Sequence, residues 1–145
     1  MTPLDLRSRP PRDPREQLAG LLMLPRTLDK ARALLPGGHA GEYFITPGLS
    51  AWLLGKLHIG EAEFVEIVRL ANDEADVAAA IEARTDVERR ERLNATLRTL
   101  RVAQISGDIR ELFFTLYGPD VDPDALVIDV LTDDDRAAFA GAGGP

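Results

Sequence analysis

Three ionisable residues that could bind an anion lie close together in the first third of the chain. Arg26, Asp29 and Lys30 fall within a stretch of helical periodicity, on the face opposite its leucines. Arginine forks and lysine ammonium groups bind carboxylates and phosphates. These side chains therefore predict a site for a small anionic ligand, in which Arg26 and Lys30 hold the anion. Asp29 would position a guanidinium, and Glu42 or Tyr43 would close the site.

The same residues allow two other interpretations. Asp29 lies three residues from an arginine on either side, so the cluster could be a solvated ladder of ion pairs, each worth about 0.3–0.5 kcal/mol. The cluster could also belong to a small enzyme that uses Asp29, Lys30, Glu42 and Tyr43 for acid–base chemistry, which requires these groups to meet in one pocket. We expect a non-enzymatic module that binds a partner protein or a small anionic ligand, with the enzyme as the alternative.

A basic arm precedes this cluster. Residues 1–12 are polar and rich in proline, which predicts an extended segment. Arg12 and Arg15 could contact an anion, and a second alternative is that the arm touches nucleic acid through its arginines (Arg7, Arg9, Arg12 and Arg15). We do not expect nucleic acid as the partner, because the chain as a whole has a net charge of −7 and repels phosphate backbones.

Neither a metal nor a cofactor is expected. The chain has no cysteine, and His39 and His58 are its only histidines. His39 with the nearby Glu42 would supply only two of the four ligands that a structural zinc ion needs. The glycines of residues 37–41 are not followed by the lysine and hydroxyl of a phosphate-binding loop.

Helical periodicity runs through most of the remaining chain and predicts an all-α fold, an irregular or orthogonal bundle of seven or eight short helices. The expected helices cover 13–22, 24–35, 47–57, 61–71, 73–81, 86–100 and 106–117, and residues 126–131 are either a further helix or a strand. At most one short strand is expected, near 42–45. We predict that residues 13–140 form a single domain and that 141–145 are a disordered tail.

The helix expected at 106–117 has the clearest apolar stripe. Ile109, Leu112, Phe113 and Leu116 recur at the spacing of one helical face, and all four are predicted to point into the core. Further along the chain, Thr132 and Asp135 have the spacing of a capping box, which predicts a helix start there.

The first third of the chain resembles an uncharacterised bacterial family, domain of unknown function 5069. The residues that carry the resemblance are Arg9-Pro10-Pro11-Arg12-Asp13-Pro14-Arg15, Leu18, Gly20, Leu24-Pro25-Arg26, Leu28-Asp29-Lys30-Ala31-Arg32-Ala33 and Gly41-Glu42-Tyr43. Where the family tends to have a Cys-Pro-Leu-Asp-like turn, this chain has Thr46-Pro47-Gly48-Leu49. The resemblance implies a bacterial, helical and cytoplasmic protein, and it implies no activity.

The expected location is the cytoplasm, without membrane contact. The first thirty residues contain no apolar run of signal-peptide length, and no later segment reaches the roughly 20 apolar residues that span a bilayer. Whether the protein is a monomer or a homodimer stays open at this stage.

Overall fold

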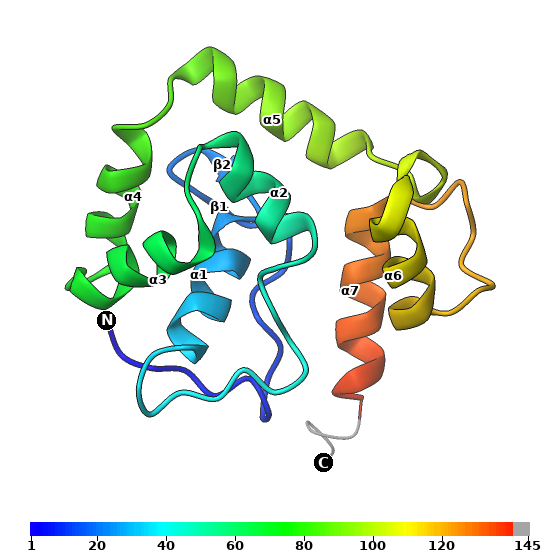
Figure 1. The fold of residues 1–145 in the computed structure, drawn as a ribbon, viewed down its shortest axis with the longest axis horizontal. Coiled ribbons are helices and arrows are strands. Elements are labelled where there is room, and N and C mark those ends of the chain that lie inside the picture. The colour runs from blue at the N-terminus through cyan, green and yellow to red at the C-terminus, as the bar shows by residue number, and fades with distance from the viewer. Residues whose placement is uncertain (141–145) are drawn as a thin grey trace.

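The computed structural model describes residues 1–140, which fold into seven helices and one very short hairpin (Figure 1). The strands are β1 (Gln17–Leu18) and β2 (Leu21–Leu22), and a single 3-10 turn, η1 (Val102–Gln104), separates α5 from α6. The helices are α1 (Leu24–Ala33), α2 (Leu49–Lys56), α3 (Glu61–Leu70), α4 (Glu74–Glu82), α5 (Val87–Thr99), α6 (Gly107–Tyr117) and α7 (Val127–Ala138). The predicted mostly helical fold is confirmed. The tail predicted for 141–145 lies outside the described residues.

The helices form two groups that α5 connects. In Figure 1, α1 to α4 surround the hairpin on one side, α6 and α7 lie together on the other, and α5 spans the distance between them. Helix α1 packs against α2 and α3, and α5 contacts both β2 and α7. The larger apolar core lies within the first group, and a smaller cluster around Phe113 joins η1, α6 and α7.

The leucine stripe of α1 occupies the centre of the larger core. Leu24, Leu28, Ala31 and Leu35 recur at three- and four-residue intervals, and all four are buried. Pro25 occupies the first turn of α1, where its missing N–H removes no helical hydrogen bond. The predicted apolar face of this helix is confirmed, and the opposite face is left to carry Arg26, Asp29 and Lys30.

The helix predicted for residues 13–22 is wrong, because this segment forms a turn and the β1–β2 hairpin. The Asp13 carboxylate accepts a hydrogen bond from the Arg15 amide instead of capping a helix. The chain then reverses at Ala19 and Gly20, which both have positive φ.

A side chain from α5 holds this hairpin in place. Asn94 accepts a hydrogen bond from the Leu22 amide at 2.9 Å and donates one to the Gly20 carbonyl at 2.8 Å. These contacts across 72 and 74 residues satisfy backbone groups that a helix would have paired locally.

The strand expected near 42–45 is also wrong, since residues 41–48 form a loop. Extended backbone pairing occurs a few residues earlier in the chain, where Asp5 of the N-terminal arm pairs with His39 in parallel. The Leu6 amide donates to the His39 carbonyl at 2.8 Å, and the His39 amide donates to the Leu4 carbonyl at 3.0 Å. Leu4 and Leu6 are buried, so residues 1–12 pack along the helical body.

The C-terminal segment is one continuous helix. Residues 127–131 are helical, and Thr132 and Asp135 lie inside α7, so the capping box predicted there is wrong. Thr132 donates its hydroxyl to the Ile128 carbonyl, and Asp135 faces inward and is buried. In α6, Phe113 is only 7% exposed, but Ile109 and Leu116 are 44% and 45% exposed, which contradicts the prediction that they lie in the core.

No helix among residues 1–140 combines the length and the apolar character needed to cross a membrane.

Candidate functional site

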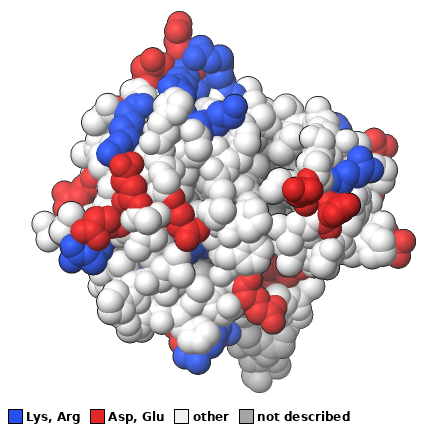
Figure 2. Space-filling model, in the orientation of Figure 1, with Lys and Arg blue, Asp and Glu red and all other residues white. Residues whose placement is uncertain are grey.

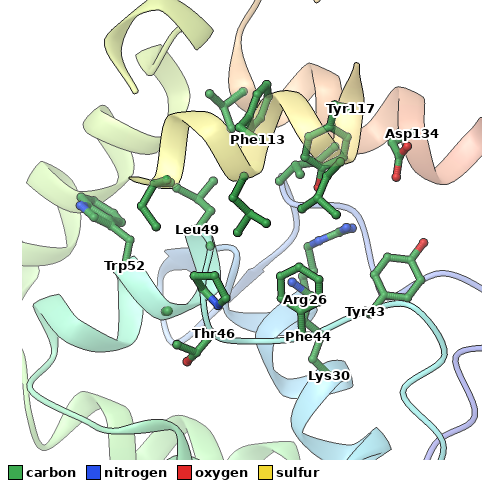
Figure 3. Close-up of a pocket in the computed structure, with 18 of the residues that line it drawn as sticks. Arg26, Lys30, Tyr43, Phe44, Thr46, Leu49, Trp52, Phe113, Tyr117 and Asp134 are labelled. Atoms are coloured by element: carbon green, nitrogen blue, oxygen red, sulfur yellow. The ribbon is translucent and has the colours of Figure 1, made fainter. Parts of the chain in front are cut away.

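A large cavity separates the two groups of helices. Its volume is about 1130 Å³, slightly above the roughly 300–1,000 Å³ that is usual for small-molecule sites. Figure 3 shows Arg26 and Lys30 reaching toward it from α1, while Phe113 and Tyr117 lie in α6 on the other side. Cavity-lining side chains therefore come from the beginning and the end of the chain.

A buried ion pair lies beside one end of the cavity. The Arg26 guanidinium donates two hydrogen bonds to the Asp135 carboxylate, at 2.6 and 3.2 Å, and both side chains are almost fully buried. The Tyr43 hydroxyl donates a third hydrogen bond to the same carboxylate at 2.8 Å. The Arg26 guanidinium also lies 5.6 Å from the centre of the Tyr43 ring. Burial and Asp135 raise the pKa of Tyr43, so the phenol stays protonated and donates.

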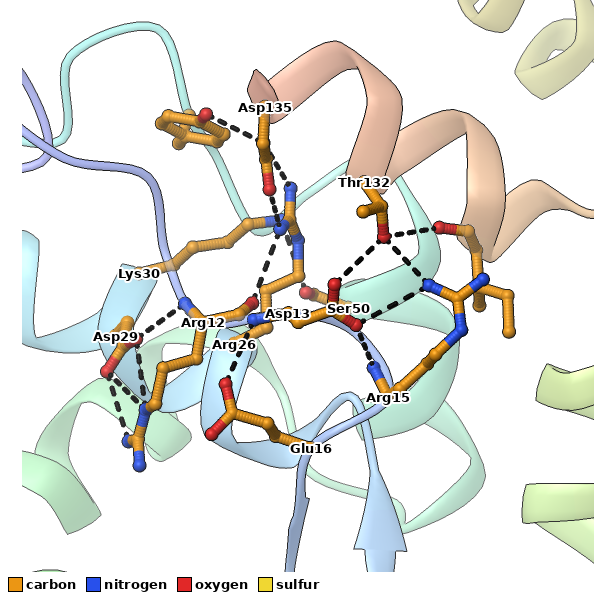
Figure 4. A network of polar contacts seen from close by, with 12 residues as sticks. Arg12, Asp13, Arg15, Glu16, Arg26, Asp29, Lys30, Ser50, Thr132 and Asp135 are labelled. Atoms are coloured by element: carbon orange, nitrogen blue, oxygen red, sulfur yellow. Dashed lines mark hydrogen bonds and ion pairs between the residues drawn. The ribbon is translucent and has the colours of Figure 1, made fainter. Parts of the chain in front are cut away.

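Lys30 is the one cation of this cluster that has no carboxylate partner among the described residues. Its amine donates to the Ser50 hydroxyl at 3.3 Å (Figure 4). The Ser50 hydroxyl in turn accepts from the Thr27 hydroxyl at 2.9 Å. Burial, together with the neighbouring Arg26 guanidinium, lowers the pKa of Lys30 to about 7, although Asp135 opposes this shift. Near neutral pH the amine is therefore present in both charged and neutral forms.

Arg26 also has one donor that the protein leaves unused. Its Nε is buried and has no hydrogen-bond partner in the part of the chain that the structure describes. Arg26 and Lys30 both line the cavity. At the cavity wall the Lys30 amine is therefore the accessible cationic group without a carboxylate partner in the described chain, while the Arg26 Nε is enclosed by protein atoms.

Asp29 faces away from these two cations. Its carboxylate accepts hydrogen bonds from the Arg12 backbone amide at 2.8 Å and from the Arg12 guanidinium at 3.1 Å (Figure 4). The same guanidinium contacts Glu74 at 2.5 Å. Asp29 and Arg26 are 5% and 2% exposed, so the interpretation of this cluster as a solvated ladder is wrong. Asp29 fixes the N-terminal arm to α1 and does not line the cavity.

Two acidic residues also line the cavity. Glu42 is exposed, and Asp134 comes from α7 next to the buried Asp135. Burial raises the pKa of Asp134, and the neighbouring Asp135 carboxylate adds to the shift. Within residues 1–140 no group of three or more acidic or histidine side chains is arranged to hold a metal ion.

The remaining wall of the cavity is apolar. Phe44 and Trp52 line it from the loop and α2, and the stripe of α6 lines it from the opposite side (Ile109, Leu112, Phe113 and Leu116). The face shown in Figure 2 is largely uncharged along its middle, with the charged side chains gathered on either side. The exposed residues of α6 therefore face a space that a ligand could fill.

The arginines of the arm are largely engaged within the protein. Arg7 pairs with Asp5 at 2.8 Å, and Arg12 pairs with Asp29 and Glu74. Arg15 pairs with Asp13 and Asp129 and donates to the Thr132 hydroxyl at 2.9 Å. The structure thus separates Arg12 and Arg15 from the cavity but brings Arg26, Lys30, Glu42 and Tyr43 to its wall.

Sequence analysis missed two residues of this site. Asp135 follows Val127, Ile128 and Leu131 at helical spacing, so a carboxylate on the buried face of a helix was the signal for a cationic partner. Ser50 gave no comparable signal, since only the fold brings its hydroxyl to Lys30.

The protein is thus mostly helical, with a cavity that both α1 and α7 line. The chain belongs to the family described as Domain of unknown function (DUF5069), whose model matches residues 8–134. The match extends the resemblance seen over residues 9–43 through α6 and into α7. No curated protein matches the chain.

Proposed function

We propose that the protein binds a small anionic ligand with an apolar body in this cavity. The observation that carries the proposal is the position of Lys30, a cation at the cavity wall whose nearest polar partner is a neutral hydroxyl. Lys30 is partly buried. Removing a charge from water without a counter-ion is costly, and a ligand carboxylate would supply the missing charge.

The apolar body of the ligand would lie against α6. Ile109 and Leu116 are partly exposed and face the cavity beside Phe44 and Trp52. Covering such a surface contributes roughly 25 cal/mol per Å². Asp135 already neutralises Arg26. Protonated Lys30 is then the positive charge of the polar end that has no carboxylate partner within residues 1–140, and a single charge suits a monocarboxylate better than a phosphate dianion.

This proposal carries over the expectation that the protein is non-enzymatic and works in a bacterial cytoplasm. The partner could also be a protein. It would then insert an acidic residue and an apolar side chain into the same cavity. Nucleic-acid binding through the arm gains no support, because Arg7, Arg12 and Arg15 are paired with carboxylates.

A thermal-shift comparison of octanoate, 1-octanol and octylamine tests the proposal, because the three share one chain and differ in charge. We expect octanoate to raise the melting temperature more than the other two, as binding to the folded state must. The gain should persist in Lys56→Met and disappear in Lys30→Met. Equal shifts for the three compounds, or for the two variants, would contradict the proposal.

A further inference from the structure

The environment of the Lys30 amine also favours covalent chemistry. We propose that Lys30 is a nucleophilic amine that forms an imine with an aldehyde or ketone bound in the cavity. This inference deepens the proposed function, in that it uses the same cavity and the same apolar wall. It adds that the ligand carries a reactive carbonyl group, which the charge of the site alone does not require.

Three features of the site support this chemistry. No carboxylate lies within ion-pair distance of Lys30 in the described chain, so no anion stabilises its ammonium form directly. The Arg26 guanidinium is a neighbouring positive charge, and the partial burial of Lys30 removes part of the water around its amine. Desolvation and an adjacent cation are the two means by which proteins keep a reactive lysine neutral.

Imine formation needs no redox partner and releases only water. The lone pair of the neutral Nζ attacks the carbonyl carbon, a C–N bond forms, and the C=O π electrons move to the oxygen. One of the two nitrogen protons passes to that oxygen and gives a neutral carbinolamine. A proton from solvent then lets the hydroxyl group leave as water, and the nitrogen lone pair forms the C=N bond of an iminium ion. This ion returns its last nitrogen proton to solvent and leaves the imine. The Ser50 hydroxyl, at 3.3 Å from Nζ, holds the amine in place at the cavity wall.

The apolar wall restricts the carbonyl compound. Since Phe44, Trp52 and the α6 stripe line the cavity, an aldehyde with an aliphatic or aromatic body gains contact area that a small polar aldehyde lacks. Octanal is therefore the appropriate probe, and glyceraldehyde is its polar counterpart.

The chain offers a natural internal control, because Lys30 and Lys56 are its only lysines. Lys56 is exposed, and its amine lies 5.8 Å from the Trp52 ring. The third amine, the N-terminus, donates to the carbonyls of Val68 and Ala71. Cleavage after arginine separates all three, which fall in peptides 1–7, 27–32 and 33–69.

The test is to treat the full chain with octanal and cyanoborohydride at pH 7 and to quantify each peptide by mass spectrometry. Reduction delivers hydride to the imine carbon and fixes the adduct. We expect Lys30 to be labelled about tenfold or more faster than Lys56, because far more of it is neutral at this pH. The preference should vanish in urea and should be smaller with glyceraldehyde. Octanoate should slow the labelling of Lys30, because it would occupy the same cavity.

Labelling of Lys30 no faster than Lys56 in the folded protein would overturn the inference. If octanoate still binds through Lys30 in that case, the proposed function stands and only the imine chemistry fails. If Lys30 is labelled selectively but octanoate does not bind, the imine chemistry stands and the proposed binding of an anionic ligand fails.

Discussion

The carboxylate of Asp135 and the guanidinium of Arg26 face each other in two hydrogen bonds, although 109 residues separate them in the chain. Tyr43 donates a further hydrogen bond to the same carboxylate. Through this contact the last helix is attached to the first, and one end of the cavity is defined.

Removing the charge of Asp135 should strongly destabilise the protein. In Asp135→Asn the buried Arg26 loses its counter-ion, and breaking a buried pair in this way costs about 3–5 kcal/mol. Asp133→Asn is the matched control, since Asp133 lies two residues away in an exposed pair with Arg136 at 3.9 Å. Urea unfolding should show a change within about 0.5 kcal/mol for the control. If Asp135→Asn lowers the free energy of unfolding no more than Asp133→Asn does, the prediction is contradicted.

Lys30 should make stability rise with pH above neutrality. Its pKa in the folded protein is about 7, below the ordinary value of 10.5. Between these values the unfolded chain binds more protons than the folded one, so the free energy of unfolding increases with pH. The difference in this quantity between wild type and Lys30→Met should therefore change between pH 7 and 9, in favour of wild type as pH rises. A constant difference over this range would contradict the lowered pKa.

The two kinds of apolar residue in α6 should respond differently to truncation. Phe113→Ala removes a buried ring and should cost about 3–5 kcal/mol in the free energy of unfolding. Ile109→Ala removes a partly exposed side chain that faces the cavity, and we expect a loss below about 1 kcal/mol. Chemical denaturation measures both. A large loss for Ile109→Ala would mean that this face of α6 is core.

The hairpin should depend on a single side chain of α5. In Asn94→Ala the Leu22 amide and the Gly20 carbonyl both lose their partner. Leaving the buried Leu22 amide unsatisfied costs roughly 1–3 kcal/mol, whereas Gly20 is exposed and its carbonyl can bond to water. Asn72→Ala, at the only other asparagine, exposes no such group and should be nearly neutral. Hydrogen exchange at Leu22 reports the same event, because its amide should lose protection in Asn94→Ala alone.

The helices could be predicted because their patterns are local. The leucines of α1 recur at helical spacing, and Asp73 and Asp86 cap α4 and α5 with their own side chains. The segment 13–22 misled for the opposite reason. Asp13-Pro14 resembles a helix start, but the contacts that decide its structure come from Asn94, more than seventy residues away.

The site was predictable only in part. Arg26 and Lys30 could be chosen from their place opposite the leucine stripe, and Tyr43 from its nearness in sequence. Their distances from Asp135 and Ser50 depend on how α2 and α7 pack, which no local spacing encodes. Asp29 was predicted to belong to the same site as Arg26 and Lys30. Its carboxylate instead binds the backbone amide and the guanidinium of Arg12 and does not line the cavity.

The ion pair between the first and last helices has a consequence for the order of events during synthesis. Arg26 leaves the ribosome more than a hundred residues before Asp135 does. Until α7 emerges, the Arg26 guanidinium has no Asp135 carboxylate to pair with, and α1 lacks its contact with α7. Assembly of the cavity therefore follows the synthesis of α7, the helix that supplies Asp135.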